Sequence, residues 1–282
     1  MGLVERVMRA GSALVGDLDI QDVLVDHHER AVVEAVLDDA RRVVVKGDLD
    51  AERSAHEARV LAAAAREGVP VPRVLARAPG PPAILVLDHI PGGWLAPERH
   101  DRAWAATGAV LRRLHGVGVA ALHEFAGQRG WSAGLAQLID HWAPRSRAAG
   151  LADDVVVGVR AATACLVGAR DGEPAIGTLH GDCVPIHVRL DDDEVVGLLD
   201  LGDACRGDAV WDLAVLTLPS PERITAVLDG YGADEALRRW FAQAAPVYRS
   251  MRLVAEVGWL AEHGYDPSRE IGEATAAAAL LR

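Results

Sequence analysis

The sequence predicts a mixed α/β protein with two lobes, a small antiparallel sheet first and a mostly helical part after it. In residues 1–90, short runs rich in Val, Ile and Leu alternate with polar turns, as is typical of strands. In residues 91–282, apolar side chains recur at helical spacing over most of the length. A chain of 282 residues is long enough for two lobes that share a cleft, and we expect their boundary near residue 90.

Composition and charge narrow the classes of function. The net charge of −12 argues against nucleic acid and against an anionic membrane surface as partners, since both attract basic proteins. The same charge permits a cationic ligand, although many acidic proteins carry it for solubility alone. No apolar run is long enough to span a bilayer, and residues 1–13 are typical of a short amphipathic helix rather than a signal peptide. The three cysteines are scattered and odd in number, which indicates free thiols in a reducing cytoplasm.

The first lobe is predicted from β-branched runs, which suit a pleated, half-buried surface. We expect strands at residues 19–25, 31–36, 43–46 and 83–90. Helical periodicity over residues 50–67 predicts a helix after the third strand. Lys46 ends that strand, a position where lysine is common on any sheet edge. Glu57 lies on the helix, where an ordinary solvated face would also account for it.

The second lobe is predicted from helical periodicity and its breakers. We expect helices at residues 101–115 and 153–167, a loop at 168–174, and helices from Ser220 onward. Pro246 is expected to kink or break one of these last helices. Trp131 and Trp142 belong either to the core or to an insert that faces a substrate.

Near the end of the chain, Glu256, Trp259 and His263 share one helix face. Glu256 stands in an otherwise apolar run, and a carboxylate there costs free energy unless it is paired. Two interpretations stay open: it faces a cleft and binds a substrate ammonium group, or it pairs with Arg252.

Two short segments, 179–188 and 197–203, carry the most specific signal. Each is an apolar strand that runs into a turn with an aspartate, Asp182 in the first and Asp200 in the second. The turn at 191–193 lies between them, so the pair is expected to form a hairpin that brings both carboxylates to one place. Phosphoryl transfer needs two such groups, one for the proton of the attacking hydroxyl and one for the metal on the phosphates.

These segments resemble the aminoglycoside phosphotransferase family, whose pattern is HGDxxxxN, then ID[FW], then GDxxxDLA. Here the chain has HGD at 180–182, LDL at 199–201 and GDAVWDLA at 207–214. The order and spacing of three blocks make this resemblance far more specific than any one block. It implies a protein-kinase-like fold and a kinase that acts on a small molecule.

The resemblance also implies roles for the residues that match it. Asp182 would be the general base, His180 would orient its loop, and Asp200 would hold Mg²⁺. Lys46 would bind the α- and β-phosphates of ATP. GTP stays possible as the nucleotide. Glu57 would pair with Lys46, with Glu52 as the alternative partner. The loop at residues 26–30 would fold over the phosphates, and because it contains no glycine, Arg30 or the histidines would supply side-chain donors.

Further roles follow for the hinge and for the acceptor side. Backbone groups of Asp88, His89 and Ile90 would meet the adenine where the two lobes join. Asp212 would tie down the catalytic loop. The candidates for contact with a cationic acceptor are Asp203, Asp208, Glu256 and Trp259.

One position departs from the family pattern. His187 stands where the family has an asparagine that binds a second metal ion. Imidazole is a softer and bulkier ligand than an amide oxygen and suits Mg²⁺ poorly. Three outcomes stay open: a reaction that uses the Asp200 metal alone, coordination through nitrogen with a more tolerant divalent ion, or a protein that binds without catalysing.

The sequence therefore indicates a cytoplasmic, ATP- and Mg²⁺-dependent kinase that phosphorylates a hydroxyl group of a small molecule. The acidic balance favours a cationic antibiotic as acceptor, either an aminoglycoside or a basic cyclic peptide such as capreomycin or viomycin, with resistance as the result. A metabolic kinase for a sugar, a choline-like alcohol or homoserine is the first alternative. A nucleotide-binding pseudoenzyme is the second. The oligomeric state does not follow from the sequence.

Overall fold

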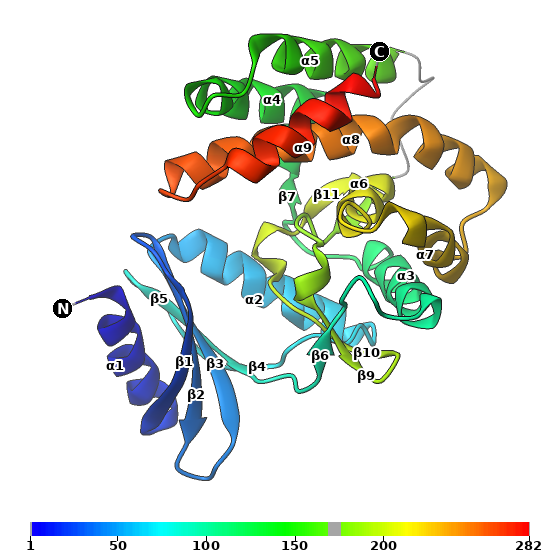
Figure 1. The fold of residues 1–282 in the computed structure, drawn as a ribbon. Helices are drawn as coiled ribbons and strands as arrows, with labels where there is room; N and C mark the ends of the chain where they lie inside the picture. The colour runs from blue at the N-terminus through cyan, green and yellow to red at the C-terminus, as the bar shows by residue number, and fades with distance from the viewer. Residues whose placement is uncertain (1, 169–175, 282) are drawn as a thin grey trace.

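The computed structural model describes residues 2–168 and 176–281, so most of the loop expected at 168–174 lies outside the described residues. A sheet-rich part comes first and a helix-rich part follows (Figure 1). The predicted division into a small antiparallel sheet and a mostly helical remainder is confirmed. No helix in the described part of the chain has both the length and the apolar character needed to cross a bilayer.

The first part is a five-stranded antiparallel sheet with the order β1-β2-β3-β5-β4. Its strands are β1 (Leu18–Asp26), β2 (Arg30–Leu37), β3 (Arg42–Asp48), β4 (Val74–Ala78) and β5 (Ala83–Asp88). The runs expected at 19–25, 31–36 and 43–46 fall within β1, β2 and β3, and the run expected at 83–90 forms β5, which ends at Asp88. Lys46 lies on β3, which is a central strand between β2 and β5 and not the sheet edge where lysine is most common.

Two helices cover opposite faces of this sheet. Alternate residues of β5 point to opposite sides: Val86 packs in one apolar cluster with α1 (Leu3–Val15), and Leu85 packs in the other with α2 (Ala51–Arg66). A Cβ at Gly47 would lie 2.0 Å from Cγ2 of Val7, so this glycine lets α1 pack tightly beside Lys46. In Figure 1, α2 lies between the sheet and the helical part.

The second part combines two small sheets with seven helices in the described chain. One sheet holds β6 (Gly93–Trp94), β9 (Val188–Asp191) and β10 (Glu194–Leu198). The other holds β7 (His123–Glu124), β8 (Ile176–Leu179) and β11 (Cys205–Asp208). The helices are α3 (Asp101–His115), α4 (Trp131–Ala148), α5 (Asp153–Gly168), α6 (Ala209–Leu216), α7 (Ile224–Tyr231), α8 (Glu235–Glu262) and α9 (Ser268–Ala279).

The β9–β10 hairpin has the predicted form. Its strands pair antiparallel with Asp191 opposite Glu194, so Asp182 precedes the hairpin and Asp200 follows it. A break at Pro246 is not found, because α8 continues through this residue from Glu235 to Glu262.

The larger apolar core crosses the expected lobe boundary. It joins Leu61 of α2 and Leu87 of β5 to the side chains of the helical part, such as Leu111 and Leu198. The boundary near residue 90 stays a prediction. The shared core holds α2 firmly against both parts, and α2 carries Glu57.

Candidate active site

A cleft of about 820 Å³ opens between the β1–β2 connection, the turns on either side of the β9–β10 hairpin and α8. The sequence-predicted site residues that line it are Arg30, Asp182, His187, Asp200, Asp203, Glu256 and Trp259. They come from segments that are far apart in the chain, so the fold brings half of the predicted site residues to one cavity.

One buried aspartate holds the turn after β8. Asp212, at the start of α6, accepts hydrogen bonds from the backbone N–H of His180 at 2.7 Å and of Gly181 at 3.1 Å. Gly181 has a φ of +86°, and a Cβ there would lie 2.1 Å from the carbonyl oxygen of Asp203. Only glycine fits this position, and Asp212 has the loop-holding contacts that the sequence predicts.

His180 ties this turn to the end of β10. Its side chain is fully buried, and its Nε2 donates to the carbonyl oxygen of Leu199 at 2.8 Å. Burial lowers the pKa of His180, so the ring is neutral and the bond does not depend on a charge. Because Asp182 lies two residues after His180 and Asp200 directly follows Leu199, this hydrogen bond positions the two carboxylates relative to each other.

The carboxylate of Asp182 faces an arginine of α8. Arg252 donates from Nη2 to Oδ1 of Asp182 at 2.9 Å, and its Nη1 lies 3.4 Å from Oε2 of Glu256. Burial alone would raise the pKa of Asp182, but the nearby charges, with Arg252 the largest of them, together outweigh burial and hold this pKa below its ordinary value. Asp182 is therefore ionised at neutral pH, the state that a general base needs.

The Arg252–Asp182 contact is a functional feature that the sequence did not reveal. The sequence predicts Arg252 only as a partner of Glu256, four residues away on the same helix face. The contact with Asp182 spans 70 residues of chain. The sequence does show an arginine within the buried stretch of α8, but this observation does not identify which carboxylate the arginine contacts.

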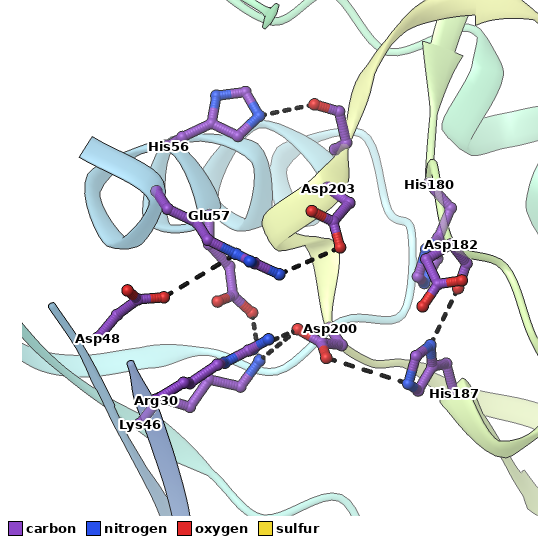
Figure 2. Close-up of polar contacts among 12 residues, drawn as sticks. Arg30, Lys46, Asp48, His56, Glu57, His180, Asp182, His187, Asp200 and Asp203 are labelled. Atoms are coloured by element: carbon purple, nitrogen blue, oxygen red, sulfur yellow. Dashed lines mark hydrogen bonds and ion pairs between the residues drawn. The ribbon is translucent and has the colours of Figure 1, made fainter. Parts of the chain in front are cut away.

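Two cations converge on one oxygen of Asp200 (Figure 2). Arg30 Nη2 lies 2.6 Å and Lys46 Nζ 3.0 Å from Oδ1 of Asp200. Burial alone would raise the pKa of Asp200, but these two charges hold it well below the ordinary value of a carboxyl. Arg30 begins β2 and Lys46 lies on β3, so both reach Asp200 from the sheet.

Glu57 of α2 completes this cluster. Its Oε1 lies 2.6 Å from Nζ of Lys46, and the carboxylate is buried. Glu52, the alternative partner, instead accepts a hydrogen bond from Arg59 at 2.8 Å. Between them, Glu57 and Asp200 hold the Lys46 ammonium beside the cleft, where a phosphate group could replace one of the two carboxylates.

Asp200 and His187 are the residues that could hold a divalent ion. His187 Nδ1 lies 3.0 Å from the carbonyl oxygen of Asp182, and Nε2 lies 4.0 Å from Oδ2 of Asp200. No group of three or more His, Cys, Asp or Glu side chains is gathered for a metal ion among residues 2–168 and 176–281. Such a sparse site suits an ion whose other ligands are phosphate oxygens and water.

The predicted hinge residues do not line the cleft. Asp88 ends β5, and its carboxylate accepts a hydrogen bond from Nε of Arg73 at 2.8 Å. The side chain of Ile90 packs over Gly197 of β10, where an added Cβ would lie 2.8 Å from its Cγ2. His89 follows Asp88 at the same junction. Contact of these three residues with a nucleotide base stays a prediction.

Two of the predicted acceptor contacts have different environments. Asp203 lines the cleft and accepts a hydrogen bond from Arg53 at 3.1 Å. Asp208 is buried, and its Oδ2 accepts hydrogen bonds from Trp240 at 2.6 Å and Tyr248 at 3.0 Å. Asp208 therefore does not face the cleft, and we correct its assignment from acceptor binding to the support of α6.

The far wall of the cleft combines carboxylates with aromatic rings. Burial raises the pKa of Glu256, against the opposing charge of Arg252. Trp259 is 39% exposed and stacks on His263 at 4.2 Å between ring centroids. Trp142 and Tyr265 line the same wall. Of the two tryptophans that the sequence left open, Trp131 is buried in the core and Trp142 faces the cleft.

One family model matches most of the chain. The model of the phosphotransferase enzyme family matches residues 23–254. No curated protein sequence matches the chain.

Several solved structures share the fold. A thermostable mutant of aminoglycoside phosphotransferase APH(4)-Ia, in complex with ADP and hygromycin B, has a TM-score of 0.71 at 14% identity and covers 97% of this chain and 98% of its own. Amicoumacin kinase hAmiN, in complex with AMP-PNP, Ca²⁺ and Ami, has a TM-score of 0.71 at 16% identity; the match covers 98% of this chain and 93% of the kinase chain. A choline/ethanolamine kinase family protein from Mesorhizobium loti has a TM-score of 0.70 at 20% identity; the match covers 99% of this chain and 94% of that protein's chain.

The contact that fixes α2 above the site predicts a pH dependence of stability. His56 is fully buried on α2, and its Nε2 lies 2.7 Å from the carbonyl oxygen of Ala204, just beyond Asp200. Burial lowers the pKa of His56 from 6.5, so the unfolded chain binds the extra proton first as the pH falls. Stability from this group is complete above pH 6.5 and is lost below it.

We therefore expect the thermal unfolding midpoint to fall between about pH 7.5 and 5.5, and to fall less in His56→Gln. The control is His141→Gln, which changes an exposed histidine of α4 and keeps the slope of the wild type. Equal slopes for His56→Gln and the wild type would contradict the assignment.

Proposed function

Because the chain belongs to the phosphotransferase enzyme family, we propose that it transfers the γ-phosphoryl group of ATP to a hydroxyl group of a small cationic molecule. Family membership confirms the predicted class, a small-molecule phosphotransferase with a hydroxyl acceptor and a protein-kinase-like fold. The donor, the metal and the acceptor are the proposal. The observation that carries it is the convergence of Asp182 and Asp200 on one cleft, with Lys46 at 3.0 Å from Asp200.

Asp182 acts as the general base. The pKa of its carboxyl is held low by Arg252, and it lines the cleft where an acceptor hydroxyl can approach. It accepts the hydroxyl proton as the oxygen attacks the γ-phosphorus. Positioning by the buried Asp212 and His180 matters as much as the proton transfer, because phosphoryl transfer depends mainly on alignment and charge.

Asp200, Lys46 and Arg30 bind the nucleotide phosphates and their metal. Lys46 and Arg30 both donate to Asp200 Oδ1, and they turn toward phosphate oxygens when nucleotide enters. Arg30 replaces the backbone amides that a glycine-rich loop would offer. Asp200 would hold a divalent ion, which would neutralise negative charge on the nucleotide phosphates. The same contacts serve GTP as well as ATP.

The acceptor subsite is the wall formed by α8 and its neighbours. Glu256 and Asp203 offer negative charge, and Trp142, Trp259 and Tyr265 offer ring faces that attract cations. This combination supports a cationic antibiotic, an aminoglycoside or a basic cyclic peptide, whose phosphorylation gives resistance. Similar structures bind hygromycin B and Ami.

A choline-like alcohol is the second candidate acceptor. Its quaternary ammonium group cannot donate hydrogen bonds and is recognised by aromatic faces. The ring pair Trp259 and Tyr265, 5.9 Å apart between centroids, is one observation in its favour. Another is the likeness to a choline/ethanolamine kinase family protein.

The proposed enzyme works in the cytoplasm, where ATP is available. Cys165, Cys183 and Cys205 are all free thiols, and Cys183 and Cys205 are buried. A reducing compartment keeps such thiols unpaired.

Replacing the proposed base tests the reaction itself. Asp182→Asn keeps the shape of the side chain but cannot take a proton, so we expect kcat to fall roughly 10²- to 10⁴-fold. ADP release is measured with ATP and a panel of aminoglycosides, basic cyclic peptides, choline, sugars and homoserine. The control, Asp192→Asn, lies in the exposed β9–β10 turn and keeps wild-type activity.

The outcomes separate the candidates. Phosphorylation of a sugar or homoserine, with no cationic acceptor turned over, would reject the proposed substrate class. Equal and negligible turnover of every acceptor by the wild type and Asp182→Asn would favour a nucleotide-binding pseudoenzyme. A variant as fast as the wild type would remove Asp182 from the role of base.

Replacing the acceptor-side carboxylate tests the charge of the substrate. Glu256→Gln loses a charge-assisted contact with the acceptor ammonium, so we expect KM for the cationic acceptor to rise about tenfold. KM for ATP stays constant. Glu235→Gln, at the other end of α8 and 85% exposed at its side chain, is the matched control. An unchanged acceptor KM in Glu256→Gln would show that this carboxylate does not contact the substrate.

A further inference from the structure

The ring of His187 is held in one tautomer by the backbone. It ends the 3₁₀ turn Pro185–His187, directly before β9, and its Nδ1 lies 3.0 Å from the carbonyl oxygen of Asp182. A carbonyl oxygen can only accept a hydrogen bond, so Nδ1 carries the proton of the neutral ring. The lone pair of a neutral His187 is therefore on Nε2.

Nε2 points toward the free side of the Asp200 carboxylate. The distance from Nε2 to Oδ2 of Asp200 is 4.0 Å, whereas Lys46 and Arg30 both bind the other oxygen, Oδ1. Figure 2 shows His187 between the carbonyl of Asp182 and this carboxylate. In the neutral ring Nε2 is an acceptor, as is Oδ2, so these two atoms do not bond to each other, and a cation is a group that both can bind.

The orientation of His187 is that of a prepared metal ligand. A histidine that binds a metal through one nitrogen commonly donates its other N–H to a carbonyl or carboxylate, which fixes the ring and strengthens the ligand. Here the carbonyl of Asp182 has that place. The ring of His180 lies nearly parallel to it, at 5.7 Å between centroids and 7° between planes, which limits rotation of His187.

We propose that His187 is a nitrogen ligand of the active-site metal and that it makes the site prefer a first-row ion such as Mn²⁺ over Mg²⁺. The inference rests on the proposed function, which places a divalent ion at Asp200. Mg²⁺ keeps to oxygen ligands, while first-row ions also accept imidazole nitrogen. The asparagine of the family pattern would offer an amide oxygen, so the exchange of one residue changes the donor atom.

The test uses Mn²⁺ both as ligand and as probe. The protein is loaded with Mn²⁺ and AMP-PNP, and electron spin-echo spectra are recorded for the wild type and for His187→Asn. In the wild type we expect ¹⁴N modulation from a directly bound imidazole. Labelling with ¹⁵N-histidine should replace this signal by ¹⁵N modulation, and the His187→Asn variant should lack the imidazole signal. Mn²⁺ affinity should fall roughly 10- to 100-fold in the variant, while Mg²⁺ affinity stays level or rises.

The control is His141→Asn on α4, outside the cleft, which keeps the ¹⁴N signal. A wild-type spectrum without a histidine nitrogen signal, or one that persists in His187→Asn, overturns the proposal. An unchanged ratio of Mn²⁺ to Mg²⁺ affinity in His187→Asn overturns the selectivity. None of these measurements requires turnover, so a protein that binds metal and nucleotide but phosphorylates nothing refutes the proposed function and leaves this inference to be decided by the spectra.

Discussion

The site depends on one partly buried carboxylate that two cations share. Asp200 comes from the hairpin of the helical part, whereas Arg30 and Lys46 come from the sheet, so their contacts cross the cleft. Removing charges from water costs free energy. The attraction within a buried ion pair offsets this cost only when the geometry is good and further hydrogen bonds are made. Here Glu57 balances Lys46 from the opposite side at 2.6 Å, so the ammonium sits between two carboxylates. This arrangement keeps cations beside the cleft, ready for phosphate.

The local part of the site could be predicted from the sequence, because its residues are close in the chain. The hairpin between Asp182 and Asp200 is a short-range feature with a turn at its centre, and the resemblance assigns both aspartates. Lys46 and Glu57 are also only eleven residues apart. The patterns place these residues on a strand and on the helix after it, and the resemblance to the family supplies the pairing.

The acceptor side could be predicted only in part: three of its four candidates line the cleft, but the partners of its polar residues depend on how distant helices pack. Arg252 and Asp208 carry charges in similar apolar surroundings, yet Arg252 faces the cleft and Asp208 bonds to Trp240 and Tyr248 inside the core. The pattern of one helix gives its apolar face but not the partner of a polar residue on that face. Pro246 shows the same limit: α8 continues through it because buried residues on both sides, Val247 among them, pack in the core.

The β1–β2 connection forms part of the cleft wall although it contains no glycine. Its tip reaches the end of α8, where the ring of His27 lies 5.3 Å and that of His28 5.7 Å from the ring of His263. The connection thus contacts both sides of the cleft and delivers Arg30 to Asp200. In the proposed function, side chains of this connection take the place of the backbone amides of a glycine-rich loop.

The proposed function requires that Asp200 exchange its two cations for a metal ion when nucleotide binds. Calorimetric titration of AMP-PNP, with and without a divalent ion, into the wild type and Asp200→Asn tests this directly. We expect the ion to tighten nucleotide binding to the wild type and to have no such effect on the variant. In the variant, Lys46 and Arg30 are freed and bind the metal-free nucleotide at least as well. An equal effect of the ion on both proteins would contradict this requirement.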